Sequence, residues 1–345
     1  MLRALTARRI ATAAAYGGGG LTALGGLTFG LIVVEAKLAR RIIQATPNGA
    51  PPVADGLYGG GAGDGEASAA PLSFVMLGDS TAAGLGVHEP DETPAALLAA
   101  GLSSIAGRPV RLTNVALSGA RSEALPDQVD KALAARPDVA VIMIGANDVT
   151  ARVPAAESVR HLAAAVERLH GAGCRVVVGT CPDLGSVQPV MQPLRWIARR
   201  ASRQLAAAQT IAVVERGGRT VSLGDLLGRE FEADPHEMFS ADRYHPSARG
   251  YAAAAAAVLP SMAAALGLEP EPEELPDVRR GEGVLPVYLA AAEAAEEPGT
   301  EVAGTRVAGR ERGPRGRWAT LLRRREVGET AEEPDDPEAV RHGAA

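Results

Sequence analysis

Short apolar runs alternate with longer stretches rich in Ala and Leu from residue 72 onwards. Five runs have the length and β-branched content of buried parallel strands: 72–77, 111–116, 139–144, 175–179 and 211–214. The stretches around them predict five helices: 94–106, 122–135, 155–171, 192–208 and 247–266. This alternation predicts a doubly wound α/β domain over 72–267, with a parallel sheet between two layers of helices.

The N-terminal segment contains a long run without charged residues. After a basic N-terminus (1–9), no charged residue occurs from Ile10 to Val34, and this run exceeds the about 20 residues that span a bilayer. A cleaved signal peptide is the alternative, but its apolar region is usually about 7–15 residues long. Here the run is longer and ends in VVEAKLARR. We therefore expect 10–34 to be a transmembrane anchor or an uncleaved signal.

Two flanking segments lack hydrophobic periodicity. Residues 35–71 are rich in Pro, Gly and Ala, which predicts a linker. Residues 268–345 are mostly acidic and Pro-rich, with an Arg-rich stretch at 315–327, and this composition is typical of a disordered tail.

Charge and cysteine content narrow the function classes. The net charge of −6 argues against nucleic-acid binding, which usually uses a basic face. Cys174 and Cys181 flank the predicted strand 175–179, so they lie about 23 Å apart at about 3.3 Å per residue. A disulfide needs Cα atoms within about 7 Å, so we expect two buried free thiols.

The first candidate for chemistry is Gly78-Asp79-Ser80, which follows the strand 72–77. In open α/β sheets, ligands bind at the carboxyl ends of the strands. The glycines that follow fit neither phosphate-binding loop pattern, and no lysine is present at the required position. The G-x-S-x-G pattern is also absent. Taken alone, the motif is either a serine nucleophile or a Gly-rich turn.

A serine nucleophile needs a base and a group that orients the base. His245 is the best candidate, because Asp242 precedes it by three residues and a helix start follows. A carboxylate there can fix the imidazole tautomer. His236, near Asp234, is the weaker substitute. The other histidines lie in a predicted helix, a loop or the tail: His88, His161, His170 and His342.

Two further strand ends carry residues suited to an oxyanion hole. Gly145-Ala146-Asn147-Asp148 follows the strand 139–144, and Gly119 lies in the loop after 111–116. The N–H of a glycine can approach a substrate closely. The Ser80 N–H, the Gly119 N–H and the Asn147 amide are therefore candidates for three oxyanion donors.

These four blocks, in this order, resemble those of the SGNH/GDSL hydrolases, which include serine esterases and lipase-like enzymes. The resemblance covers about 72–267 and carries all four block residues: Ser80, Gly119, Asn147 and His245. It implies a flavodoxin-like sheet of order 2-1-3-4-5 and ester hydrolysis without a metal or organic cofactor. The run SGARS around Gly119 departs from the more polar run expected there, which bears on the acyl pocket.

The resemblance implies a Ser80-His245-Asp242 triad that hydrolyses a small-molecule, lipid or glycan ester. An acyltransferase to a sugar or lipid hydroxyl on the same machinery and a non-catalytic interaction protein on this fold remain alternatives. The segment 183–200, with Trp196, is expected either to line the acyl site or to pack between helices.

Location is the least determined property. Three arginines precede the apolar run and three basic residues follow it, so the positive-inside rule gives no clear orientation. Many bacterial relatives of this kind act outside the cytoplasm. We therefore expect a membrane-anchored enzyme with an extracytoplasmic catalytic domain.

Overall fold

The structure is a computed structural model of the 345-residue chain. It describes residues 30–39, 41, 43, 49–59, 70–224, 231–268, 301–302, 306–307 and 310–311. Met1–Ala303 form one compact unit, and Gly304–Ala345 form a second one. Within the second unit, β8 (Arg306–Val307) pairs with β9 (Arg310–Glu311).

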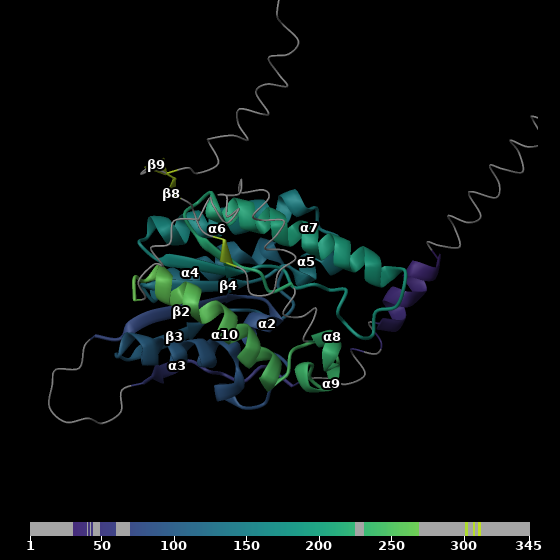
Figure 1. The fold of residues 1–345 in the computed structure, drawn as a ribbon, viewed down its shortest axis with the longest axis horizontal. Coiled ribbons are helices and arrows are strands. Elements are labelled where there is room, and N and C mark those ends of the chain that lie inside the picture. Colours follow the sequence, from purple (N-terminus) through teal and green to yellow (C-terminus); the bar gives the residue numbers. More distant parts are fainter. Residues whose placement is uncertain are drawn as a thin grey trace, which may run out of the picture. The chain divides into compact units, whose positions relative to one another are not determined.

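A seven-stranded sheet forms the centre of the first unit (Figure 1). Its strands are β1 (Gly56–Tyr58), β2 (Leu72–Gly78), β3 (Val110–Asn114), β4 (Val139–Met143), β5 (Arg175–Gly179), β6 (Arg219–Val221) and β7 (Glu301–Val302). The order is β1-β3-β2-β4-β5-β6-β7. The five central strands are parallel, and their order is the predicted 2-1-3-4-5. The edge strands β1 and β7 are antiparallel to their neighbours.

Helices cover both faces of the sheet. The longer ones are α3 (Pro94–Ala106), α4 (Leu125–Ala134), α6 (Ala155–Gly171), α7 (Leu194–Val214) and α10 (Ala248–Ala265). The short ones are α2 (Ser80–Ala83), α5 (Ala146–Ala151), α8 (Phe231–Ala233), α9 (Pro235–Met238) and the 3₁₀ turns Pro90–Glu92 and Ser122–Ala124. Residues 30–39, the N-terminal helix, are also helical.

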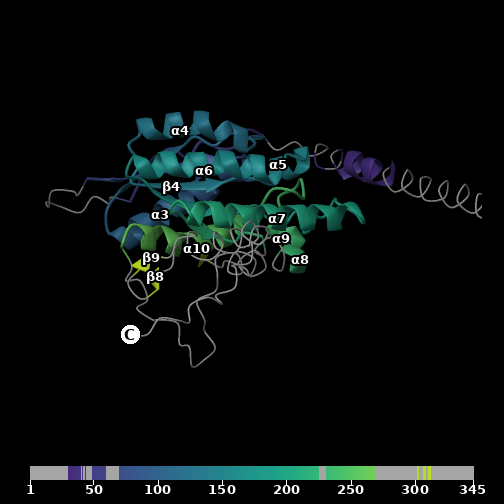
Figure 2. The same ribbon diagram turned by 90° about the horizontal axis from the view of Figure 1, so that it is seen from above.

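Two apolar cores lie on opposite faces of the sheet, because side chains alternate along each strand. On β2, Phe74 and Met76 contact α3 and α10, whereas Val75 and Leu77 contact α4 and α6. Figures 1 and 2 show α3 and α10 on one side of the strands and α4 and α6 on the other. The α/β fold predicted from the sequence is therefore confirmed.

The predicted fifth strand at 211–214 is wrong. These residues form the last turn of α7, and the strand is Arg219–Val221. A run of four apolar residues is compatible with either structure. Here Val213 is fully buried against the sheet from the helix side, and the chain turns only at Gly217, whose φ is +76°.

The flanking segments also differ in part from expectation. The predicted linker 35–71 includes part of the N-terminal helix and the strand β1. No helix among the described residues is long and apolar enough to cross a membrane. Residues 10–29 of the predicted anchor lie outside the described residues, as does most of the predicted tail. Cys174 and Cys181 are free and buried, as predicted.

Candidate active site

Ser80 lies at the carboxyl end of the central strand β2, where the chain turns into α2. Gly78 has a φ of +138°, and a Cβ there would stand 1.9 Å from the Met143 carbonyl oxygen of β4, so the turn requires glycine. Asp79 caps α2, and its Oδ1 accepts a hydrogen bond of 2.9 Å from the Thr81 N–H. The Ser80 side chain is thereby held at the carboxyl end of the central strands.

His245 lies in a tight turn before α10, and Asp242 closes this turn. One carboxylate oxygen of Asp242, Oδ1, accepts hydrogen bonds from the Tyr244 N–H and the His245 N–H, both at 2.9 Å, and from the Ser240 hydroxyl at 2.8 Å. The Ser240 N–H donates to the His245 carbonyl at 2.8 Å. The second oxygen, Oδ2, remains directed at the imidazole.

The structure brings Ser80, His245 and Asp242 together from positions 165 residues apart in the chain. His245 Nε2 lies 3.0 Å from Ser80 Oγ, and Nδ1 lies 2.6 Å from Asp242 Oδ2. All three side chains are buried. The Tyr244 ring meets the imidazole edge to face, with centroids 4.8 Å apart. A serine, an imidazole and a carboxylate thus form one hydrogen-bonded chain.

The pKa values of the two carboxyl groups of the site are shifted in opposite directions. Burial alone raises the pKa of Asp242, but hydrogen bonds and charge interaction with His245 outweigh it and lower the pKa to about 2. Burial raises the pKa of Asp79 to about 6, despite the Thr81 hydrogen bond. Asp242 is therefore ionised throughout the neutral range, whereas Asp79 gains a proton below about pH 6.

The predicted oxyanion donors lie on adjoining loops. Gly119 is exposed in the loop after β3 with a φ of +80°, and Asn147 lies in α5, just after β4. The Asn147 amide donates to the Ala120 carbonyl at 3.0 Å, which ties these loops together. Asp148 is buried and accepts from the Ser122 N–H at 3.1 Å, which reinforces the same connection.

The alternative histidines do not join this group. His88 and His236 are exposed, and His161 and His170 lie on α6. His342 lies outside the described residues. Within the described part of the chain, no group of three or more His, Cys, Asp or Glu side chains is arranged to hold a metal ion.

Sequence reasoning missed two buried glutamines that hold the strand ends. The Gln128 amide, on α4, accepts from the Gly78 N–H at 2.7 Å and donates to the Gly78 carbonyl at 2.9 Å. Gln209, on α7, accepts from the Cys181 N–H at 2.7 Å and donates to the Ile144 carbonyl at 2.9 Å. Each supplies an acceptor to a buried backbone N–H and donates to a nearby backbone carbonyl. A glutamine within an amphipathic helix carries no sequence signal for this role.

A small cavity of about 30 Å³ borders Asp79 and Thr81 on the side of α10. Its other walls include the apolar side chains of Met143, Leu223 and Phe231. A volume of this size accommodates about one water molecule. The Asp79 carboxyl group therefore faces surroundings that solvate a negative charge poorly.

Comparison with known proteins places this site in a family. The sequence model of the GDSL-like Lipase/Acylhydrolase family matches residues 76–253, which include every candidate site residue. The GDSL-like esterase Rv1075c of Mycobacterium tuberculosis is 45% identical over 252 residues, which cover 71% of this chain and 79% of that protein. The chain belongs to the GDSL-like lipase/acylhydrolase family. It is accordingly an acyl hydrolase that acts on ester bonds.

Solved structures that resemble this chain at low sequence identity include TesA and Axe2. TesA is 22% identical, with a TM-score of 0.44, over 56% of this chain and 99% of its own. Axe2, an acetylxylan esterase from Geobacillus stearothermophilus, is 18% identical, with a TM-score of 0.43, over 57% of this chain and 95% of its own.

Proposed function

We propose that the protein is a serine esterase in which Ser80, His245 and Asp242 form the catalytic triad. The observation that carries this proposal is the unbroken hydrogen-bonded chain from Ser80 Oγ through the imidazole to Asp242 Oδ2. Ser80 Oγ attacks the ester carbonyl carbon while His245 Nε2 takes the hydroxyl proton. Asp242, ionised at neutral pH, fixes the tautomer and stabilises the imidazolium.

The tetrahedral intermediate carries a negative oxygen that needs donors. The Ser80 N–H has no partner within its own helix, because Ser80 is the first residue of α2. With the Gly119 N–H and the second N–H of the Asn147 amide, it would form a three-donor oxyanion hole. The bond between Asn147 and Ala120 supports this role, because it holds the amide beside the Gly119 loop.

Three further proton transfers complete the reaction. As the bond to the leaving oxygen breaks, the imidazolium gives its proton to that oxygen, and an acyl group remains on Ser80 Oγ. Water then attacks the acyl carbon, loses its proton to His245 and releases the acid, while Ser80 recovers its proton. The substrate class is a small-molecule, lipid or glycan ester, and the name of the mycobacterial relative supports an esterase activity.

The experiment is a nitrophenyl acetate assay combined with fluorophosphonate labelling. The Ser80→Ala variant should lose about three orders of magnitude or more of turnover and all labelling. Ser104→Ala is the matched control, because Ser104 is an exposed serine on α3, and it should keep both. Labelling that persists in Ser80→Ala would assign the nucleophile to another residue.

The same assay separates hydrolysis from acyl transfer. With a sugar or lipid alcohol added, a hydrolase releases the free acid, whereas an acyltransferase yields a new ester. We expect the free acid as the main product. A new ester in excess of the acid would make the protein a transferase on the same triad.

We also propose that the protein is anchored in a membrane by residues 10–34, with the catalytic domain outside the cytoplasm. The uncharged run from Ile10 to Val34 supports this location. The protein should remain in the membrane fraction through a high-salt wash, and protease should digest the domain once the outer envelope is opened. Digestion only after lysis would reverse the orientation.

A further inference from the structure

The N-terminal helix buries an acidic side chain and exposes a stripe of large apolar ones. Leu31, Val34 and Leu38 recur at spacings of three and four, so they form one stripe, and all three are exposed, Val34 at 60%. Glu35 is only 8% exposed, and its Oε2 accepts a hydrogen bond of 3.1 Å from the Leu194 N–H. Glu35 and the small side chain of Ala39 are thus buried, whereas the stripe of large apolar side chains faces outward.

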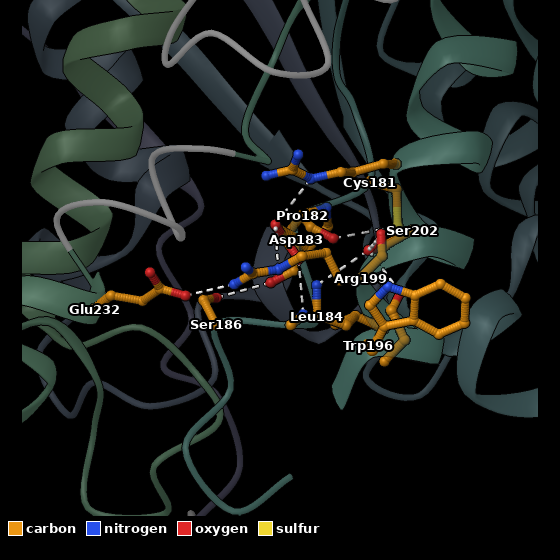
Figure 3. Close-up of polar contacts among 12 residues, drawn as sticks. Cys181, Pro182, Asp183, Leu184, Ser186, Trp196, Arg199, Ser202 and Glu232 are labelled. Atoms are coloured by element: carbon orange, nitrogen blue, oxygen red, sulfur yellow. Dashed lines mark hydrogen bonds and ion pairs between the residues drawn. The ribbon is translucent and has the colours of Figure 1, made fainter. Parts of the chain in front are cut away.

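The start of α7, which Glu35 contacts, is also apolar on its outside. Met191 and Ile197 are exposed, and Trp196 is 60% exposed. Figure 3 shows the indole of Trp196 pointing away from the polar contacts beside it. Of the segment 183–200, which the sequence left either lining the acyl site or packing between helices, Trp196 is mostly exposed to solvent.

A network of ion pairs fixes the start of α7 on the domain (Figure 3). The side chain of Asp183 is fully buried, and its Oδ2 lies 3.3 Å from Arg199 Nε and 3.1 Å from Arg203 Nε. The Leu184 N–H donates to the Ser202 hydroxyl at 3.2 Å. Arg199 also pairs with Glu232. These contacts hold the first turns of α7, which carry the exposed Trp196, against the domain.

Together these side chains form one surface, here called the docking surface. Its members are Leu31, Val34, Leu38, Met191, Trp196 and Ile197. Figures 1 and 2 both place the N-terminal helix next to the free end of α7. Because α7 begins beyond the carboxyl end of β5, this surface lies at the same end of the sheet as Ser80.

We propose that the docking surface binds an anionic lipid bilayer. Its margin is basic, since Lys37, Arg41 and Arg200 are exposed beside it, while Glu35 is buried. A helix that lies at a membrane interface combines an apolar face, often with Trp, and cationic neighbours. Two residues of the apolar stripe, Leu31 and Val34, belong to the uncharged run Ile10–Val34. A second copy of the chain would bring like charges together, which disfavours it as the occupant.

Docking orients the catalytic domain. The end of the sheet that carries Ser80 turns towards the bilayer, so the enzyme acts on esters at or near the lipid surface. This consequence rests on the proposed function, whereas the binding itself does not. An experiment that measures contact with lipid, and does not depend on enzyme turnover, therefore tests membrane binding separately from the proposed esterase function.

The chain supplies its own reporter, because it contains two tryptophans, Trp196 and Trp318. The full-length Trp318→Phe variant is reconstituted into phosphatidylglycerol-containing vesicles, with and without brominated lipid. We expect at least about a twofold loss of Trp196 emission in brominated vesicles, because an interfacial helix buries its apolar face about 5–10 Å into the headgroup and acyl boundary.

The control moves the reporter to the opposite end of the sheet. Ile105 is exposed near the end of α3, so Ile105→Trp, combined with Trp196→Phe and Trp318→Phe, should show no quenching. Replacing anionic by zwitterionic lipid, or introducing Lys37→Glu with Arg200→Glu, should reduce the quenching of Trp196.

Three results would overturn the proposal. The first is Trp196 emission that brominated lipid leaves unchanged. The second is equal quenching in zwitterionic vesicles, which would show that the surface does not require anionic lipid. The third is a concentration-dependent blue shift of Trp196 emission without lipid, which assigns the surface to a second copy of the chain.

Discussion

Replacing Asp79 by Asn should stabilise the protein above pH 6 and leave its stability nearly unchanged below pH 4. The Asp79 carboxyl group is 2% exposed and borders an apolar cavity, so burial opposes its ionisation and raises its pKa from 3.8 to about 6. An Asn side chain keeps an oxygen that accepts from the Thr81 N–H, and it carries no charge. The variant therefore removes the cost of a buried carboxylate and retains the helix cap.

The sign and size of this change in the free energy of unfolding follow from proton linkage. Below pH 3.8 the carboxyl group is protonated in both folded and unfolded chains, so ionisation costs the folded state nothing. Between pH 3.8 and about 6 the unfolded chain ionises while the folded one stays protonated, and the wild-type protein loses stability as pH rises. At about 1.4 kcal/mol per pH unit, the loss above pH 6 is about 3 kcal/mol.

The assay is urea unfolding of the chain lacking residues 1–45, at pH values from 4 to 8, for wild type and variant. The free energy of unfolding of Asp79→Asn minus that of wild type should rise through pH 4–6 and then stay level. Asp130→Asn is the control, because Asp130 is an exposed partner of Arg168, and its difference should be small at all pH values. A difference for Asp79→Asn that is flat with pH, or negative at pH 8, would refute the argument.

Three further variants test the site, the first two by steady-state kinetics with nitrophenyl acetate and the third by urea unfolding. Asn147→Ala should lower kcat by about 10²–10³-fold with a smaller change in KM, and a raised KM at constant kcat would exclude an oxyanion role. Asp242→Asn should lower kcat by about 10⁴-fold, because the wrong His245 tautomer is favoured, and a near wild-type rate would contradict that role. Gln128→Ala leaves the buried Gly78 N–H without its acceptor, so urea unfolding should show a loss of about 1–3 kcal/mol, whereas an unchanged midpoint would make the contact dispensable.

Much of the fold was predictable because each element carries its own local signal. The strand at 175–179 and the helices at 94–106 and 155–171 have the predicted bounds. The signal failed at 211–214, where four apolar residues fit a helix facing the sheet as well as a strand. It also failed for β1 and β7, which lie within the predicted linker and the predicted tail, because short edge strands depend on pairing with a neighbour.

The candidate site was predictable in its membership and not in its geometry. Ser80, His245 and Asp242 were named from short motifs, and only folding brings Ser80 Oγ to 3.0 Å from His245 Nε2. The supporting amides of Gln128 and Gln209 could not be found in advance. Their role depends on which strand end lies beside them, and that is a property of the packed sheet.

The sequence by itself determined most of the order of elements, the candidate catalytic motifs and the family, since each of these rests on short local stretches of the chain. The tertiary structure decided what depends on contacts between distant segments. Burial sets the raised pKa of Asp79. The contact between Glu35 and Leu194 turns the apolar stripe of the N-terminal helix outward, beside Trp196. Solvent exposure is a property of the folded surface, and no local pattern specifies it.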